Sequence, residues 1–370
     1  MTDRYARHRA IQGFSQAELQ ASRIAVIGAG AIGNEVVKNL CLLGVGAIDI
    51  YDFDTVELHN LTRSVLLREA DVGKSKAVSV ARRAAELDSA VSIRAIDGDV
   101  WHTLRFADLV RYRCVIAALD NFEARLRVNV LCWIAGVDWI NAAIDSRYVT
   151  VEAFPFGSSL RDADKPPACY ECGLPASAYQ RIAERYSCGG LQRAAIRQRI
   201  MPTTTITASL AGAQAVNHAL RPGVQAQRWL LDSNSGLASV ARLTRAQGCP
   251  GCGDHPLGAS RVALQENSAA ALDAAAVEAE AQSLRLSDAL IWHCTCANCG
   301  ATPTTRAAEL RRAGDVSDQI TFCTQCMSQA VSVQLRDEFE TGELTRRFAP
   351  HVAIPARYAL ANDACIDLQV

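Results

Sequence analysis

Eight cysteines of the sequence form four Cys-x-x-Cys pairs, a spacing that is typical of zinc binding. The two central pairs contribute Cys169, Cys172, Cys249 and Cys252. Four thiolates complete a tetrahedral zinc site and leave no coordination position open for a substrate. The sequence therefore predicts a structural zinc that joins two distant segments of the chain.

The other two pairs lie near the C-terminus and contribute Cys296, Cys299, Cys323 and Cys326. Their spacing predicts a second zinc, so that each chain holds two ions. A metal helps to fold a small module, and we expect residues 258–370 to form one with little core of its own. No histidine or carboxylate pattern for catalysis accompanies the pairs, which favours partner recognition. The alternative is a cap that only buries the edge of the main sheet or extends a dimer interface.

A glycine-rich loop, with Gly28, Gly30 and Gly33, follows the apolar run Ile24–Ile27. Such a loop lets backbone N–H groups at a helix N-terminus approach a phosphate. Asp52 lies at the end of the next expected strand, where a carboxylate binds ribose hydroxyls. These residues alone predict NAD about as well as ATP.

Four further polar residues favour a triphosphate over a nicotinamide dinucleotide, namely Asn60, Arg63, Lys76 and Asp120. Cations neutralise a transferring phosphate, and a carboxylate holds magnesium. Asp120 follows an expected strand, at the crevice where doubly wound sheets bind ligands. The polar set therefore indicates ATP with Mg²⁺.

Alternating strand and helix patterns predict an α/β fold with a doubly wound, mostly parallel sheet. The expected strands are residues 23–27, 47–51, 92–96, 113–119 and 138–143, with helices at 34–43 and 76–87. Residues 148–154 suit an antiparallel extension of this sheet, and residues 155–202 a crossover loop that zinc staples. A helix at 205–220 and a strand at 240–244 complete the first domain, residues 1–257. A further helix is expected at 268–284, in the second domain, residues 258–370.

The composition indicates a soluble globular protein. The chain has 370 residues, of which 49% are hydrophobic and 21% charged, and its net charge is −1. This charge provides no electrostatic basis for binding nucleic acid or an anionic membrane. No apolar run is long enough to span a bilayer, and the N-terminus lacks the apolar segment of a signal peptide. We therefore expect a cytoplasmic protein whose paired thiols bind metal instead of forming disulfides.

The ordered motifs between residues 4 and 255 resemble those of the ubiquitin-activating-enzyme family of adenylyltransferases, which includes the molybdopterin-synthase and thiamine-biosynthesis enzymes. The resemblance implies a Rossmann-like adenylation domain that uses ATP. It also implies that Asp52 binds the ribose, Asn60 and Arg63 the phosphates, Lys76 the α-phosphate and Asp120 magnesium. The central cysteines match the positions of the family's structural zinc ligands.

Two more residues acquire roles through the resemblance. Arg4-Tyr5-Ala6-Arg7 is similar to the family's Arg-Tyr-x-Arg, whose second arginine reaches the ATP of the partner subunit. Arg7 therefore implies a homodimer, although a solvated surface charge is the alternative. Cys188 lies where some members form a thioester, and nearby arginines favour its thiolate. The alternative is an inert buried cysteine; Cys294 and Cys365 have no assigned role.

The expected reaction is adenylation of the C-terminal carboxylate of a ubiquitin-like protein, followed by thioester formation on Cys188 and transfer to a conjugating enzyme. The basic segment after Cys188 and the C-terminal module depart from the simple bacterial members. No rhodanese-like tail is recognisable. The alternatives are a sulfur-carrier adenylyltransferase, a ribosomal-peptide-modifying adenylase, a binding module without turnover and, more distantly, an NAD-dependent oxidoreductase.

Overall fold

The computed structural model describes residues 4–159, 166–175, 177, 179, 202–221, 223, 225–253, 255–302 and 322–368. The chain divides into two compact units. The first comprises residues 1–104 and 108–258, and the second comprises residues 259–370 with 105–107.

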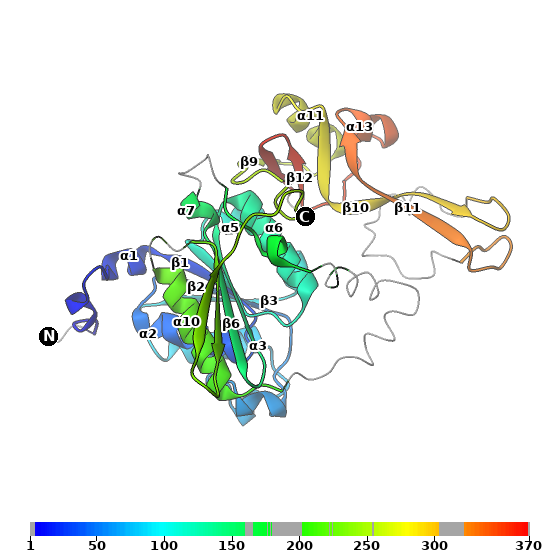
Figure 1. Ribbon diagram of the computed structural model, residues 1–370. Helices are drawn as coiled ribbons and strands as arrows, with labels where there is room; N and C mark the ends of the chain where they lie inside the picture. Colours follow the sequence, from blue (N-terminus) through cyan, green and yellow to red (C-terminus); the bar gives the residue numbers. More distant parts are fainter. Residues whose placement is uncertain are drawn as a thin grey trace. The chain divides into compact units, whose positions relative to one another are not determined.

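The first unit is built on an eight-stranded sheet with the order β3-β2-β1-β4-β5-β6-β7-β8 (Figure 1). The strands are β1 (Arg23–Ile27), β2 (Ala47–Asp52), β3 (Ser92–Asp97), β4 (Cys114–Ala117), β5 (Asp138–Ile144), β6 (Tyr148–Phe154), β7 (Gln227–Asp232) and β8 (Ala238–Arg242). The strands from β3 to β5 in this order are parallel, whereas β6, β7 and β8 pair antiparallel. The predicted doubly wound, mostly parallel sheet is confirmed.

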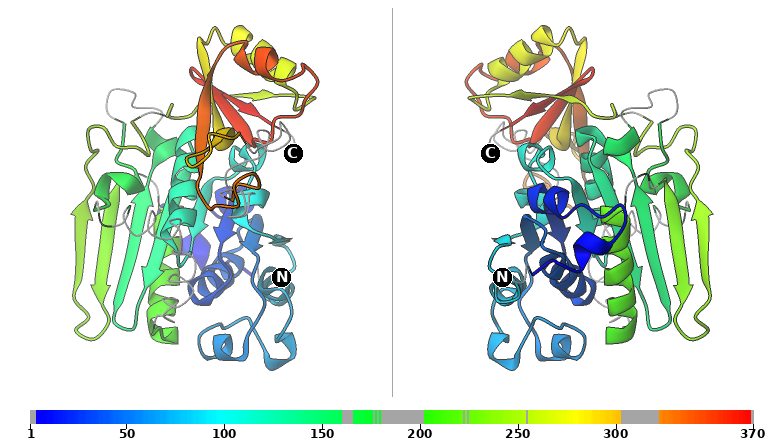
Figure 2. Two further views of the ribbon diagram at one scale, coloured as in Figure 1. Left: turned by 90° about the vertical axis from the view of Figure 1, so that its right-hand side faces the viewer. Right: turned by 90° about the vertical axis from the view of Figure 1, so that its left-hand side faces the viewer.

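Helices cover both faces of this sheet (Figures 1 and 2). The longer ones are α2 (Ala31–Leu43), α3 (Lys76–Ala85) and α10 (Thr205–Leu220) on one face and α6 (Phe122–Ala135) on the other. The shorter elements are α1 (Gln16–Ala21), α4 (Val100–Thr103), α5 (Phe106–Leu109), α7 (Phe156–Ser159), η1 (His8–Ala10), η2 (Leu58–Thr62), η3 (Glu69–Asp71) and η4 (Tyr170–Gly173). Within the described part of the chain, no helix has the length and apolar character to cross a membrane.

Among the longer elements of the first unit, α6 and β7 have no counterpart in the sequence-based expectation. Helix α6 begins after Asn121, whose side chain caps it, and ends at Gly136 in the left-handed conformation. Strand β7 adds a ladder between β6 and β8. The expected strand at 240–244 is instead β8, which starts at Ala238. All five residues of β8 are exposed, so no burial pattern marks its ends.

The second unit contains a five-stranded sheet with the order β11-β10-β12-β13-β9. Its elements are β9 (Ser260–Ala263), α11 (Ala269–Glu278), β10 (Ser283–Cys296), β11 (Val331–Glu340), α13 (Glu343–Arg347), β12 (Tyr358–Ala361) and β13 (Ala364–Asp367). The expectation of a helix up to residue 284 is wrong. The backbone turns at Glu280, which has a φ of 53°, and β10 begins at Ser283.

The expectation that the second unit has little core of its own is also wrong. Leu272, Leu284, Leu290, Phe339 and Ile366 are among a cluster of buried residues between its sheet and helices. Apolar burial therefore stabilises this unit in addition to any metal.

Candidate functional site

Three strand ends bring the predicted nucleotide residues to one edge of the first sheet. The glycine loop follows β1, Asp52 ends β2, and Asp120 lies shortly after β4. These strands are adjacent and parallel, so their carboxyl ends meet at the same edge. The chain passes from β1 to β2 on one side and reaches β4 on the other, which makes this edge a topological switch point.

The three loop glycines are required for different reasons. Gly28 has a φ of 95°, and a Cβ atom there would lie 2.5 Å from the carbonyl oxygen of Ala118. A Cβ atom on Gly33 would lie 1.8 Å from the carbonyl oxygen of Gly28. Gly30, in contrast, has a φ of −76°, and its Cβ position faces open space. Gly30 therefore leaves open space at the N-terminus of α2, here called the phosphate cradle, where a methyl group would hinder the approach of a phosphate to the backbone N–H groups.

The side chain of Asp52 is hydrogen-bonded to the glycine loop. Its Oδ2 accepts a hydrogen bond of 2.6 Å from the Ala29 N–H, and its Oδ1 accepts one of 2.8 Å from the Asp54 N–H. Burial raises the pKa of Asp52, while these two N–H groups and the charge of Lys76 oppose the rise. Each oxygen keeps a further lone pair, so the carboxylate can still accept from ribose hydroxyls.

Lys76 is the first residue of α3, and Ser75 caps this helix. The Lys76 N–H donates to the Asp54 carbonyl at 2.9 Å, and its Nζ lies 2.7 Å from Asp54 Oδ2. The lysine side chain is only 13% exposed, whereas that of Asp54 is 51% exposed. The ammonium group is thus held in place by a carboxylate that an anionic ligand can replace.

Asn60 and Arg63 lie in the segment that includes η2. Asn60 is buried, and its Oδ1 accepts a 2.9 Å hydrogen bond from the Glu57 N–H within its own turn. Arg63 is half-buried, and its guanidinium donates to the His59 carbonyl at 2.8 Å. Asn60 therefore shapes the loop, while Arg63 is accessible to a ligand.

Asp120 is exposed, and its Oδ1 accepts a 3.3 Å hydrogen bond from the amide of Asn121. The side-chain oxygen of Asn121 caps α6 through the Ala124 N–H at 2.8 Å. An exposed carboxylate at the start of a capped helix is chemically suited to magnesium, a cation that prefers oxygen ligands.

The N-terminal segment is anchored by the residues that precede Arg7. Arg4 Nε lies 3.1 Å from Asp88 Oδ2, and the Tyr5 hydroxyl donates to the same carboxylate. Arg7 is exposed and makes no ion pair with a described residue. Its role in a partner subunit stays a prediction.

One residue of this edge is not indicated by any motif. Asn34 is a fully buried amide in the first turn of α2. A polar residue on the inner face of an apolar helix is the one signal that the sequence offers for Asn34.

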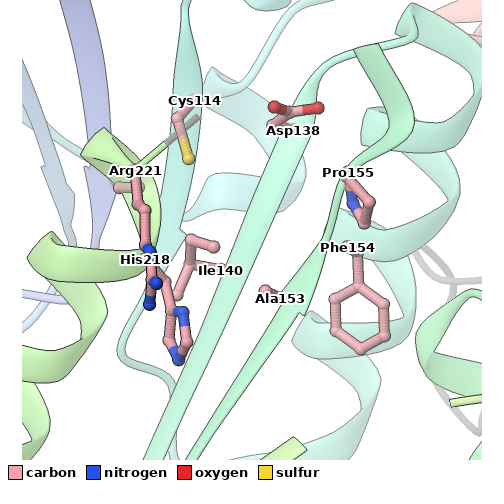
Figure 3. A pocket seen from close by; sticks show the side chains of 9 residues that line it. Cys114, Asp138, Ile140, Ala153, Phe154, Pro155, His218 and Arg221 are labelled. Atoms are coloured by element: carbon pink, nitrogen blue, oxygen red, sulfur yellow. The ribbon is translucent and has the colours of Figure 1, made fainter. Parts of the chain in front are cut away.

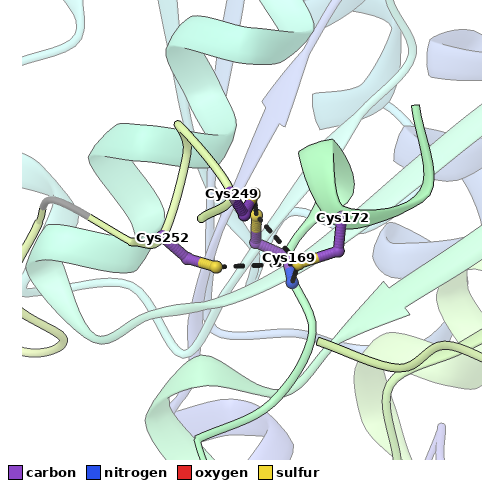
Figure 4. A group of neighbouring side chains, drawn as sticks. All are labelled: Cys169, Cys172, Cys249 and Cys252. Atoms are coloured by element: carbon purple, nitrogen blue, oxygen red, sulfur yellow. Dashed lines mark hydrogen bonds between the residues drawn. The ribbon is translucent and has the colours of Figure 1, made fainter. Parts of the chain in front are cut away.

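The central cysteines form a cluster in which all four sulfur atoms lie within 4.8 Å of one another (Figure 4). The Sγ–Sγ distances are 3.6 Å for Cys169 and Cys249, 3.8 Å for Cys169 and Cys172, and 3.6 Å for Cys172 and Cys252. Zinc–sulfur bonds of about 2.3 Å give tetrahedral edges of about 3.8 Å. The cluster therefore fits zinc and joins η4 to the chain after β8.

The second group of cysteines lies in the second unit and also forms a cluster. Cys296 and Cys326 approach to 3.5 Å between sulfur atoms, and Cys299 and Cys323 to 3.7 Å. The Ser328 hydroxyl lies 3.0 Å from the sulfur of Cys326. These distances also fit a tetrahedral thiolate site.

A small pocket in the first unit is lined by none of the predicted nucleotide-binding residues (Figure 3). It is lined by Cys114 and Asp138, the first residues of β4 and β5, and by His218 and Arg221 at the end of α10. It therefore lies at the opposite end of the strands from the nucleotide residues.

Cys188 lies outside the described residues. The other two unassigned cysteines, Cys294 and Cys365, are fully buried in the second unit. Neither thiol is accessible to a protein substrate in this structure.

Comparisons with known proteins agree with this geometry. The model of the ThiF family matches residues 3–251. A SUMO-activating enzyme subunit 2 from Dictyostelium discoideum is 34% identical over 176 residues, which cover 46% of this chain and 25% of the relative. A sulfur carrier protein adenylyltransferase from Thermus thermophilus is 30% identical over 247 residues, which cover 65% of this chain and 86% of the relative.

A solved structure of E. coli MccB with MccA-N7isoASN has a TM-score of 0.54 and 24% identity, and covers 68% of this chain and 76% of that one. This likeness concerns the fold. The family match spans most of the chain, and the chain belongs to the ThiF family. It spans between about a quarter and about half of the length of the first curated relatives that it matches.

Proposed function

We propose that this chain is an ATP-dependent adenylyltransferase that activates the C-terminal carboxylate of a ubiquitin-like protein. The observation that carries the proposal is the convergence of the open Gly30 cradle, Asp52, Lys76 and Asp120 at the switch point of the sheet. Membership of the ThiF family supports it.

Each of these residues has its own role in the proposed reaction. The N–H groups at the start of α2 and the charges of Arg63 and Lys76 stabilise the phosphates, Asp52 binds the ribose and Asp120 holds Mg²⁺. The carboxylate of the protein substrate attacks the α-phosphorus, which forms an acyl–phosphate bond. The bond to the β-phosphate breaks and pyrophosphate leaves, without any proton transfer. Positioning and charge stabilisation supply the catalysis.

The second step in this proposal uses Cys188. Its thiolate attacks the acyl carbon, a C–S bond forms and AMP leaves, and the product is a thioester that a conjugating enzyme can receive. Incubation with ATP and the carrier protein should give a conjugate that thiols cleave, and Cys188→Ser should replace it with a thiol-resistant ester. A thiol-sensitive conjugate in Cys188→Ala would show that another cysteine acts.

A sulfur-carrier adenylyltransferase is the second candidate, because the Thermus thermophilus relative is matched over 86% of its length. A peptide adenylase is the third, on the basis of the MccB-like fold. ATP–pyrophosphate exchange in the presence of each substrate class distinguishes these candidates from one another.

The test of adenylation is the exchange activity of Asp120→Ala. Loss of the magnesium carboxylate should abolish exchange, while Asp363→Ala, a change at an exposed aspartate of the second unit, should leave it intact. Undiminished exchange in Asp120→Ala would contradict the magnesium role. The absence of ATP binding and exchange in the unaltered protein would contradict the proposed function itself.

We further propose a homodimer in which Arg7 acts on the ATP of the partner subunit. Arg7→Ala and Asp120→Ala should each be inactive. After subunit exchange in an equal mixture, heterodimers contain one intact site, and about a quarter of the activity should return. Arg7 acting within its own chain would give no recovery.

For the C-terminal module expected from the sequence, residues 258–370, we propose recognition of the carrier or of a conjugating enzyme. At its cysteine cluster, Phe322 and Met327 are exposed apolar side chains, 39% and 71% accessible. Met327→Asp should impair transfer to the partner and spare adenylation. An effect on adenylation alone would favour a structural role for this unit.

A further inference from the structure

Asn34 joins two loops of the nucleotide site through a side chain that is fully buried. Its Nδ2 donates hydrogen bonds to the carbonyl oxygens of Ala29 at 2.7 Å and Gly30 at 2.9 Å. Its Oδ1 accepts a hydrogen bond of 2.9 Å from the Leu66 N–H. Two acceptors on one side and a donor on the other permit only this amide orientation.

The two loops have different functions at the site. The Ala29 and Gly30 carbonyls belong to the glycine loop, which leads into the N-terminus of α2 at Gly30. Leu66 is buried in the core three residues after Arg63, which is half-buried. The Asn34 amide therefore links the glycine loop to the segment that carries Arg63, the arginine that is expected to bind the same triphosphate.

We infer that Asn34 is a positioning residue for the nucleotide, because it sets the distance between the glycine loop and the Arg63 loop. The inference rests on the proposed ATP-dependent function. It specifies that Asn34 acts on the β- and γ-phosphates through Arg63 and that it does not itself contact the nucleotide.

The test compares ATP with AMP, which lacks the outer phosphates. Asn34→Ser should keep a bond to the carbonyl of Gly30, four residues earlier, but lose the acceptor for Leu66. It should therefore fold more readily than Asn34→Ala and still release the Arg63 loop. In both variants the ratio of ATP affinity to AMP affinity, measured by calorimetry, should fall about tenfold.

A double-mutant cycle identifies the route of the effect. In an Arg63→Ala background, Asn34→Ser should change the ATP affinity by less than about twofold, because the group that it positions is absent. Asn129→Ser is a matched control. Asn129 is a buried asparagine of α6 that accepts a hydrogen bond from the Tyr170 N–H at 3.0 Å, far along the chain from the glycine loop. Its loss should lower stability without changing the ATP-to-AMP ratio.

The outcomes separate this inference from the proposed function. If the unaltered protein binds no ATP, the function is wrong whatever Asn34 does. If it binds ATP and Asn34→Ser keeps the ATP-to-AMP ratio, or if the effects of Asn34→Ser and Arg63→Ala add fully, the positioning role is wrong and the function stands.

Discussion

Two single variants, Gly30→Ala and Gly33→Ala, should distinguish an effect on ATP affinity from an effect on the free energy of unfolding. At Gly33 the new Cβ atom would lie 1.8 Å from the Gly28 carbonyl oxygen, over 1 Å closer than any real contact, and backbone must move. Overpacking typically costs about 1–3 kcal/mol, and we expect the upper end because no flexible side chain can yield. At Gly30 no atom lies within 4 Å of the new Cβ, and the φ of −76° is open to alanine.

The free energy of unfolding of Gly30→Ala should therefore stay within about 1 kcal/mol of the unaltered value, because the weaker helix cap and the less flexible unfolded chain offset each other. Its ATP affinity should nevertheless fall at least about tenfold, since the methyl group occupies the phosphate cradle. Urea unfolding and calorimetric titration with ATP measure the two quantities. Unchanged ATP affinity in Gly30→Ala would refute the cradle, and a fully stable Gly33→Ala would refute the packing argument.

Asp54→Asn should free Lys76 for the phosphates and tighten ATP binding, measured by calorimetry, by up to about fivefold. This factor corresponds to the free energy of a partly exposed ion pair. Weaker ATP binding in the variant would instead indicate that Asp54 itself contributes to nucleotide binding. Burial, and next the charge of Arg221, hold the pKa of His218 below its ordinary value. The folded protein therefore binds fewer protons there than the unfolded chain, and the free energy of unfolding should decline as the pH falls below about 6.5. His218→Gln should lessen that decline in urea titrations at several pH values, and an identical pH profile would exclude His218 as its source. Metal analysis should find two zinc ions per chain and one in Cys323→Ser, whereas two ions in that variant would contradict the second site.

The sequence alone determined the features that depend on short-range geometry. Helix α10 runs from Thr205 to Leu220 as expected, because a threonine caps its start and small apolar residues continue to its end. The glycine loop, Asp52 and the Cys-x-x-Cys pairs were also recognisable, since each depends on spacing within a few residues. The sequence pattern does not predict helix α6, because residues on several sides of this helix are buried and it therefore lacks the single apolar stripe of a surface helix.

Only the tertiary structure decided which distant groups meet. The order β2-β1-β4 brings Asp52 and Asp120 to one edge, the turn before α3 places Lys76 on Asp54, and α2 carries Asn34 to the Leu66 N–H. The pattern of residues along the sequence shows which secondary structure each segment prefers. The proximity of residues far apart in the chain follows instead from the packing of the whole core, which selects one strand order among those that the local patterns allow.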